Sequence, residues 1–219
     1  MRIIINSSTL RGYIPRFIML IIGLFIVSNG VVLNIRADLG VNPWDIFHIG
    51  LANQTGLSIG RITQIVGFTL IAISYFMRVR FNVGTIINVI SVGFFIDMIM
   101  YYGYIPETNL LLQQMFYFIF GVALIGLGIA IYISAGLGAG PRDSLMLALT
   151  KTTRFSKGTI RTFMEVIVVI VGYFLGGPLG IGTVVFALTL GIFMTMGFSL
   201  INFLIKGLPA PEDSAVKER

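Results

Sequence analysis

The stretch LGVNPWDIFHIG, residues 39–50, decides how this chain folds. It is apolar enough to lie inside a membrane, yet it contains an amide, a proline, an acid and a histidine. A second stretch, LGAGPRDSLMLA at residues 137–148, has the same pattern. A proline and an acid at matching places in both stretches predict one structural element that is used twice.

Each stretch has the features of a helix start. Asn42 is a good N-cap, Pro43 suits the first helical position, and Asp45 falls third, where an acid complements the helix dipole. The second copy fills the same three places with Gly140, Pro141 and Asp143. A glycine two residues before each cap permits a tight turn, and these glycines are Gly40 and Gly138.

The two helices that follow are predicted to be short, at residues 43–54 and 141–152. About 12 residues at 1.5 Å each span about 18 Å, which is too short for a hydrocarbon core of about 30 Å. Each segment either enters the membrane and returns or lies flat at the interface. The glycines and the apolar run DIFHIGLA favour re-entry, which brings the two helix starts to a shared central region.

Composition indicates an integral membrane protein. The 219 residues are 56% hydrophobic and 11% charged, with a mean hydropathy of +0.95. The net charge of +6 is read as membrane topology and not as nucleic-acid binding, because the basic residues flank apolar runs. The absence of cysteine excludes disulfides and thiolate metal sites, and neither a metal nor a cofactor is expected.

Six membrane spans are predicted, at residues 15–35, 62–78, 82–103, 113–134, 160–176 and 181–205. Basic residues precede the first span and fill the loops after the second and fourth spans, which predicts that both termini are cytoplasmic. We divide the chain into a basic N-terminus (1–16), a first repeat (17–104), an external linker (105–112), a second repeat (113–205) and a disordered cytoplasmic tail (206–219).

The division into repeats rests on internal similarity. Displaced by 98 residues, the sequence pairs with itself without a gap from Gly23/Gly121 to Met98/Met196. The identical pairs include Pro43/Pro141 and Asp45/Asp143. Three spans per repeat is an odd number, so the second copy is expected to have inverted topology, which is a common architecture of transporters.

The candidate ligand-binding residues lie at the two helix starts and are Asn42, Trp44, Asp45, His48, Gly140, Arg142 and Asp143. The aspartates either cap their own helices or contact a substrate or proton. Trp44 is either a binding residue or an interfacial anchor, and His48 is either a titrating group or a hydrogen-bonded side chain. Arg142 lies unfavourably at a positive helix end, so it needs a partner, which we expect to be Asp143, a lipid headgroup or an anionic ligand.

Four further polar residues fall within the predicted spans, where such groups are costly and indicate function: Gln64, Asn88, Asp97 and Glu165. Glu165 is expected to pair with Arg161, four residues earlier on the same helix. Asp97 has no evident local partner.

The runs ADLGVNPWDIFHIGL and AGLGAGPRD, together with the six-span pattern, resemble the YczE/YyaS/YitT family of bacterial membrane proteins. The resemblance implies a multi-span fold in the bacterial inner membrane. Some relatives are linked to export of small molecules or to antibiotic production. The resemblance supplies no catalytic residues.

The favoured hypothesis is a secondary transporter or exporter of a small polar or anionic molecule, with a proton as the coupling ion and a site between the repeats. The alternative is a membrane scaffold or regulator of a partner complex. An enzyme is not expected, because the chain has one histidine, no cysteine and neither an H-E-x-x-H nor a G-x-S-x-G motif. The expected partners are the lipid bilayer, a small-molecule substrate and a proton; a homo-oligomer is compatible with the sequence, and no nucleic acid is expected.

Overall fold

The computed structural model describes residues 12–79, 81–138 and 140–205, which form eight helices and no strand. The helices are α1 (Tyr13–Ala37), α2 (Pro43–Thr55), α3 (Ile59–Phe76), α4 (Val83–Tyr102), α5 (Leu111–Ser134), α6 (Pro141–Thr152), α7 (Lys157–Phe174) and α8 (Ile181–Ile205). The all-helical class is confirmed. Most of the predicted basic N-terminus and the whole predicted tail lie outside the described residues.

Five of these helices are long and apolar enough to cross a membrane, namely α1, α3, α4, α5 and α8. The remaining predicted span, 160–176, corresponds to α7, which is not among them because its 18 residues include Lys157, Arg161 and Glu165. The prediction of membrane-crossing helices therefore holds for five of the six.

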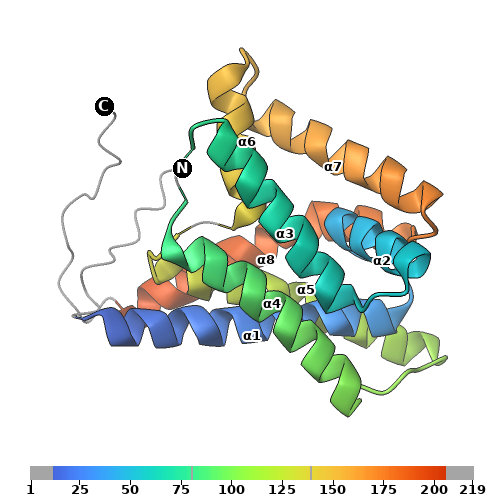
Figure 1. Ribbon diagram of the computed structural model, residues 1–219. Helices are drawn as coiled ribbons and strands as arrows, with labels where there is room; N and C mark the ends of the chain where they lie inside the picture. The colour runs from blue at the N-terminus through green and yellow to red at the C-terminus, as the bar shows by residue number, and fades with distance from the viewer. Residues whose placement is uncertain (1–11, 80, 139, 206–219) are drawn as a thin grey trace.

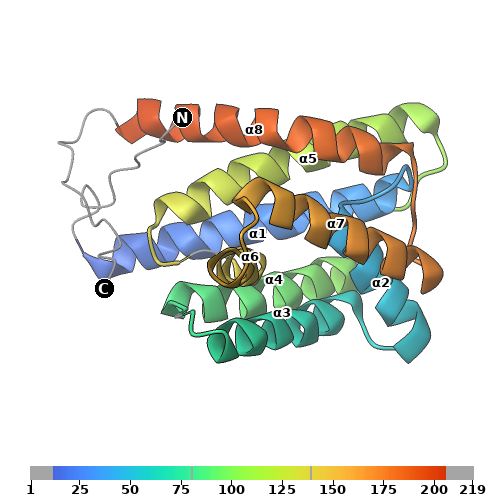
Figure 2. The ribbon, with the colours of Figure 1, turned by 90° about the horizontal axis from the view of Figure 1, so that it is seen from above.

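The helices form a row with a second layer over one face. Figure 2 shows α8, α5, α1, α4 and α3 side by side, and each helix contacts the next. The shorter helices α2 and α6, together with α7, lie over this row (Figure 1). In Figure 2, α6 is seen nearly end-on, so its axis runs across the long helices. The first turn of α1 and the last turn of α8 lie at the same end of the molecule.

Helices α1 and α5 pack through glycines at the centre of the row. A Cβ atom on Gly30 would lie 2.6 Å from the carbonyl oxygen of Gly121, and one on Gly128 would lie 2.7 Å from that of Gly23. Small residues let helix backbones approach closely inside a membrane, where dispersion replaces the hydrophobic effect as the main attraction. The α1–α5 contact is therefore a backbone-to-backbone packing that has no room for larger side chains.

Two backbone hydrogen bonds hold the loops that precede the short helices. The amide of Gly182, at the start of α8, donates to the carbonyl of Leu39 at 2.7 Å. The amide of Gly84, at the start of α4, donates to the carbonyl of Leu137 at 3.1 Å. The two donors are 98 residues apart in the sequence, and so are the two acceptors. The same spacing separates the first residues of α1 and α5, of α2 and α6, of α3 and α7, and of α4 and α8. The same bond thus fixes the chain just before each short helix.

We predict that Gly30→Val destabilises the protein, whereas Gly191→Val does not. A side chain at Gly30 meets the backbone of α5, and such overpacking destabilises by about 1–3 kcal/mol. A Cβ atom on Gly191 of α8 would have no neighbouring atom within 4 Å, so the same change is accommodated there. Unfolding of both variants in detergent micelles measures the difference. Equal stability of the two would contradict the packing described for α1 and α5.

Candidate binding site

The start of α2 is held by its own polar side chains. Asn42 is the N-cap, and its Oδ1 accepts a hydrogen bond from the backbone amide of Trp44 at 3.2 Å. Its Nδ2 donates to the carboxylate of Asp45 at 3.1 Å. Pro43 occupies the first helical position, where a backbone N–H would have no intrahelical acceptor, so the lack of one in proline breaks no hydrogen bond. Asp45, 5% exposed, is therefore fixed in orientation beside the positive end of α2.

The start of α6 has the same geometry with a simpler cap. Gly140 is the N-cap and offers no side chain, and Pro141 again opens the helix. The carboxylate of Asp143 faces the backbone of Gly140, as an acid at the third helical position does in a capping box. Each aspartate thus lies within the first turn of its own short helix.

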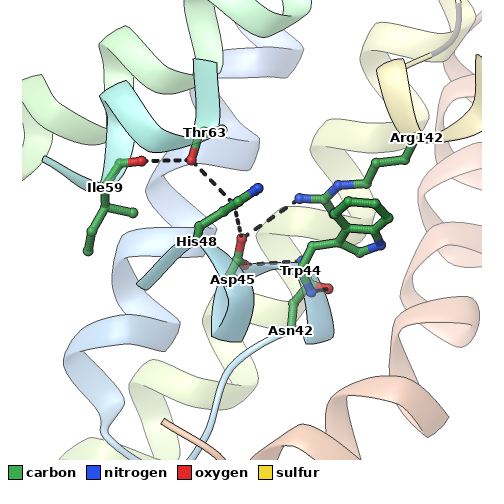
Figure 3. Close-up of polar contacts among 7 residues, drawn as sticks. All are labelled: Asn42, Trp44, Asp45, His48, Ile59, Thr63 and Arg142. Carbon is green, nitrogen blue, oxygen red and sulfur yellow. Dashed lines mark hydrogen bonds and ion pairs between the residues drawn. The ribbon is translucent and has the colours of Figure 1, made fainter. Parts of the chain in front are cut away.

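The two helix starts meet through Arg142. Its guanidinium carbon lies 4.9 Å from the centre of the Trp44 ring, and its Nη2 lies 3.9 Å from Oδ1 of Asp45 (Figure 3). The expected partners of Arg142 did not include these residues, which lie about one repeat earlier in the sequence. The contact also corrects the interpretation of Trp44 as an interfacial anchor, because its side chain is buried under Arg142, with 6% of its surface exposed.

His48 continues this polar cluster into α3. Its Nδ1 lies 3.3 Å from the hydroxyl of Thr63 and 3.6 Å from Oδ1 of Asp45. The Thr63 hydroxyl donates its proton to the carbonyl of Ile59, so its oxygen accepts from His48. In the neutral ring Nδ1 therefore carries the proton and Nε2 carries a lone pair. Nε2 has no hydrogen-bond partner among the described residues, and it points away from Thr63 in Figure 3.

A cavity of about 660 Å³ lies where the two helix starts meet. All seven candidate residues line it, as do both prolines. The rest of its wall is mostly apolar and comes from the long helices, with side chains such as Val31, Val89, Ile96, Ile125, Leu190 and Phe198. Its volume falls within the about 300–1,000 Å³ typical of small-molecule sites.

Among the described residues, the cavity lining is most exposed along α7 and α8. Its exposed lining residues are Arg161, Ala187, Gly191 and Thr195, all on α7 or α8. The lining residues on α3 and α4 are buried or half-buried. The opening therefore lies between α7 and α8.

The opposite pair of helices, α3 and α4, is closed by glycines and by Asp97. Gly60 and Gly93 pack so tightly that a Cβ on either would overlap the carbonyl oxygen of the other. The carboxylate of Asp97 accepts hydrogen bonds from the Ser58 hydroxyl at 2.6 Å and from the Gly60 amide at 2.8 Å. Asp97, which has no local partner along its own helix, thus ties α4 to the start of α3.

The remaining predicted residues divide between the cavity and the helix contacts. Asn88 and Glu165 line the cavity, and Glu165 pairs with Arg161 at 3.0 Å, as expected. Gln64 lies outside it and donates to the carbonyl of Ile90, which adds to the α3–α4 contact. Gly40 and Gly138 also lie outside and have φ of 113° and 139°, a conformation that favours glycine at the two turns.

Sequence reasoning missed Tyr132, which is 8% exposed and lines the cavity from α5. Tyr132 lies 98 residues after Asn34, so a polar side chain occupies this place in both copies. This match of polar residues between the two copies is the sequence signal that could have identified Tyr132. The described residues contain no group of three or more histidine or acidic side chains that could hold a metal ion.

Comparison with known proteins places the chain in a family. A family model described as "Family of unknown function (DUF6198)" matches residues 14–198. The chain belongs to this family. The Bacillus subtilis "Uncharacterized membrane protein YczE" is 35% identical over 198 residues, covering 89% of this chain and 91% of YczE. The resemblance to YczE and its relatives, and the assignment as a membrane protein, are thereby confirmed.

Two further relatives are more distant. An "Uncharacterized protein" of Haemophilus influenzae is 31% identical over 172 residues, covering 78% of each chain. The B. subtilis "Uncharacterized protein YyaS" is 29% identical over 166 residues, covering 74% of this chain and 82% of YyaS. No solved structure matches.

We predict that Asp45 and Arg142 are energetically coupled. Asp45→Asn leaves the guanidinium without its nearest anion and should destabilise by about 1–3 kcal/mol. Once Asp45 is neutral, Arg142→Gln no longer removes an ion pair and costs less stability. The double variant should therefore lose at least about 0.5 kcal/mol less than the sum of the losses of the two single variants. Unfolding of the wild type, both single variants and the double variant in detergent measures the coupling. Full additivity would show that the two helix starts do not interact.

Proposed function

We propose that this protein is a secondary transporter or exporter of a small polar or anionic molecule, and that the cavity is its substrate site. The observation that carries the proposal is the meeting of two short-helix starts across one cavity. Free N–H groups and positive dipole ends of half-helices bind polar or anionic groups in membrane transporters. Catalysis forms no part of the proposal.

The proposed architecture is a pair of inverted-topology repeats with six spans. It is supported by the 98-residue spacing of the helix starts and by the reciprocal bonds of Gly84 and Gly182. In this architecture α7 also crosses the membrane, as the fifth span along the chain. Its Arg161 and Glu165 line the cavity, while apolar side chains such as Phe163 and Ile167 are exposed, which is how a charged span is accommodated in lipid.

The proposed location is the bacterial inner membrane with both termini in the cytoplasm. The cavity opens beside Arg161, one turn after Lys157, in the chain segment with the densest positive charge. Basic loops are retained on the cytoplasmic side. In this proposal the described conformation is the state that is open to the cytoplasm and closed at the opposite face.

The proposed alternating access uses two glycine pairs. Gly158 and Gly191 occupy the places of Gly60 and Gly93 one repeat later, but a Cβ atom on Gly191 would have no neighbouring atom within 4 Å. In the second state, α7 packs on α8 through this pair and α3 leaves α4. A proton is the proposed coupling ion, because carboxylates within membrane spans can serve as proton relays.

We predict that Asp45→Asn combined with Asp143→Asn abolishes transport. Both changes remove charge at the helix starts while preserving side-chain size. Compounds that raise the melting temperature of the purified protein, from a panel of small anions, amino acids and antibiotics, are tested for uptake into proteoliposomes. Uptake should occur with wild type and with Lys151→Gln, a control at the far end of α6, but not with the double variant. Normal uptake by a folded double variant would contradict the proposal.

We further predict that Gly158→Leu abolishes transport without destabilising the protein or weakening binding. A Cβ atom at this position would meet only Oγ of Ser156, at an ordinary contact distance of 3.8 Å, and the position does not line the cavity. A leucine there prevents α7 from approaching α8 as closely as α3 approaches α4. Unfolding, ligand-induced thermal shift and proteoliposome uptake are measured on the same preparation. A variant that transports at the wild-type rate would rule out closure through this glycine pair.

A further inference from the structure

The charges that line the cavity nearly balance. Two acid–base pairs account for four of the charged side chains: Asp45 with Arg142, and Glu165 with Arg161. Asp143 is the remaining acid, and no described basic side chain forms an ion pair with it. The two helix starts contribute about half a positive charge each, which offsets this one carboxylate. A ligand with a net charge would upset the balance in a medium where an unpaired charge is costly.

Two side chains that line the cavity have polar atoms that make no hydrogen bond to any described residue. The guanidinium of Arg142 makes no hydrogen bond to any described residue, because its contact with Asp45 is 3.9 Å long and its other contact is with the Trp44 ring. Its five N–H donors are therefore available to a carboxylate. Nε2 of His48, a side chain only 2% exposed overall, offers an acceptor at the same end of the cavity.

The remainder of the cavity suits an apolar group. Six apolar side chains from the long helices, named above, line it, and so do Met146, Met164 and Met194. Methionine adapts its shape to varied apolar ligands. A volume of about 660 Å³ far exceeds that of an inorganic or two-carbon anion. The site thus combines charged side chains of both signs with a large apolar lining.

We propose that the cavity binds a zwitterion with an apolar body, such as an apolar amino acid derivative or small peptide. Its carboxylate binds Arg142, its ammonium group lies against Asp143, and its apolar body packs on the wall formed by α4, α5 and α8. This assignment names the substrate class of the proposed transporter and rests on that function only for the transport step. Binding itself is a separate property of the site.

The first test compares four forms of one apolar dipeptide that differ in the charges of their two ends. L-leucyl-L-phenylalanine carries both charges, its N-acetyl form carries only the carboxylate, its C-terminal amide carries only the ammonium group, and the N-acetyl amide carries neither. Diglycine has both charges without the apolar body. Binding to the purified full chain is measured by calorimetry and thermal shift. The free dipeptide should bind at least about tenfold more tightly than each blocked form, since a charge-assisted hydrogen bond contributes about 1.5–3 kcal/mol. It should exceed diglycine by at least the same factor, since diglycine has no apolar side chain to bury.

The second test assigns each charge to its residue. With Arg142→Gln, the free dipeptide should bind no more tightly than its amide, because the partner of the carboxylate is gone. With Asp143→Asn, it should bind no more tightly than its N-acetyl form. Lys151→Gln, on the same helix, should retain the wild-type preference. The comparison of ligands on the wild-type protein stands even if either variant fails to fold.

Different outcomes separate the two proposals. Equal or tighter binding of the N-acetyl form, of the amide or of diglycine overturns the zwitterion assignment, and so does the absence of binding by all five compounds. Tighter binding of the N-acetyl form leaves an anion transporter intact. Preferential binding of the free dipeptide, without its uptake into proteoliposomes, supports the assignment and counts against transport.

Discussion

A loop that enters a membrane protein must have its peptide groups satisfied by protein, and this constraint organises the structure. The carbonyls of Leu39 and Leu137 each accept a bond from the first turn of a long helix in the other half of the chain. The second loop gains two more bonds from Arg16, whose guanidinium donates to the carbonyls of Ala135 and Gly136. Because lipid offers no hydrogen bonds, the loops are confined to the places where these donors lie. The short helices then begin inside the molecule.

Close backbone packing makes those bonds geometrically available. Gly182 can donate to Leu39 only because neither it nor Gly180 carries a side chain at the contact. The lack of side chains at the glycines of α1 and α5 likewise lets these two helices pack closely. Helix starts that come this close would expose free N–H groups and positive dipole ends to hydrocarbon, so polar residues must accompany them. The clustering of Asn42, Asp45 and Asp143 at the helix starts follows from this requirement.

Local features of the sequence predicted the short helices well. Asn42, Pro43 and Asp45 act within one turn, so their roles as cap, first residue and third residue do not depend on distant parts of the chain. Both short helices begin at the predicted residues, and the longer helices begin within about three residues of the expected positions. Glu165 likewise found the partner that a spacing of four residues indicates.

Contacts between distant elements could not be predicted in this way. Arg142 binds Trp44 and Asp45 because α6 turns across the long helices, and nothing near Arg142 in the sequence encodes that direction. Asp97 caps the start of a different helix, 37 residues from Gly60. The internal repeat was the one long-range signal, since it predicted that the two helix starts would be related, but it carried no distance between them.

The differences between the repeats are more informative than their similarity. If both halves adopted the same packing, Gly191 would be as crowded as Gly93, and the cavity would be closed on both sides. Thr195 stands in the place of Asp97, so the open side lacks the carboxylate that ties α3 to α4. One helix pair thus carries an ionisable tie and the other does not. The pair that Asp97 ties is closed, whereas the pair with threonine in its place leaves Gly191 without a neighbour.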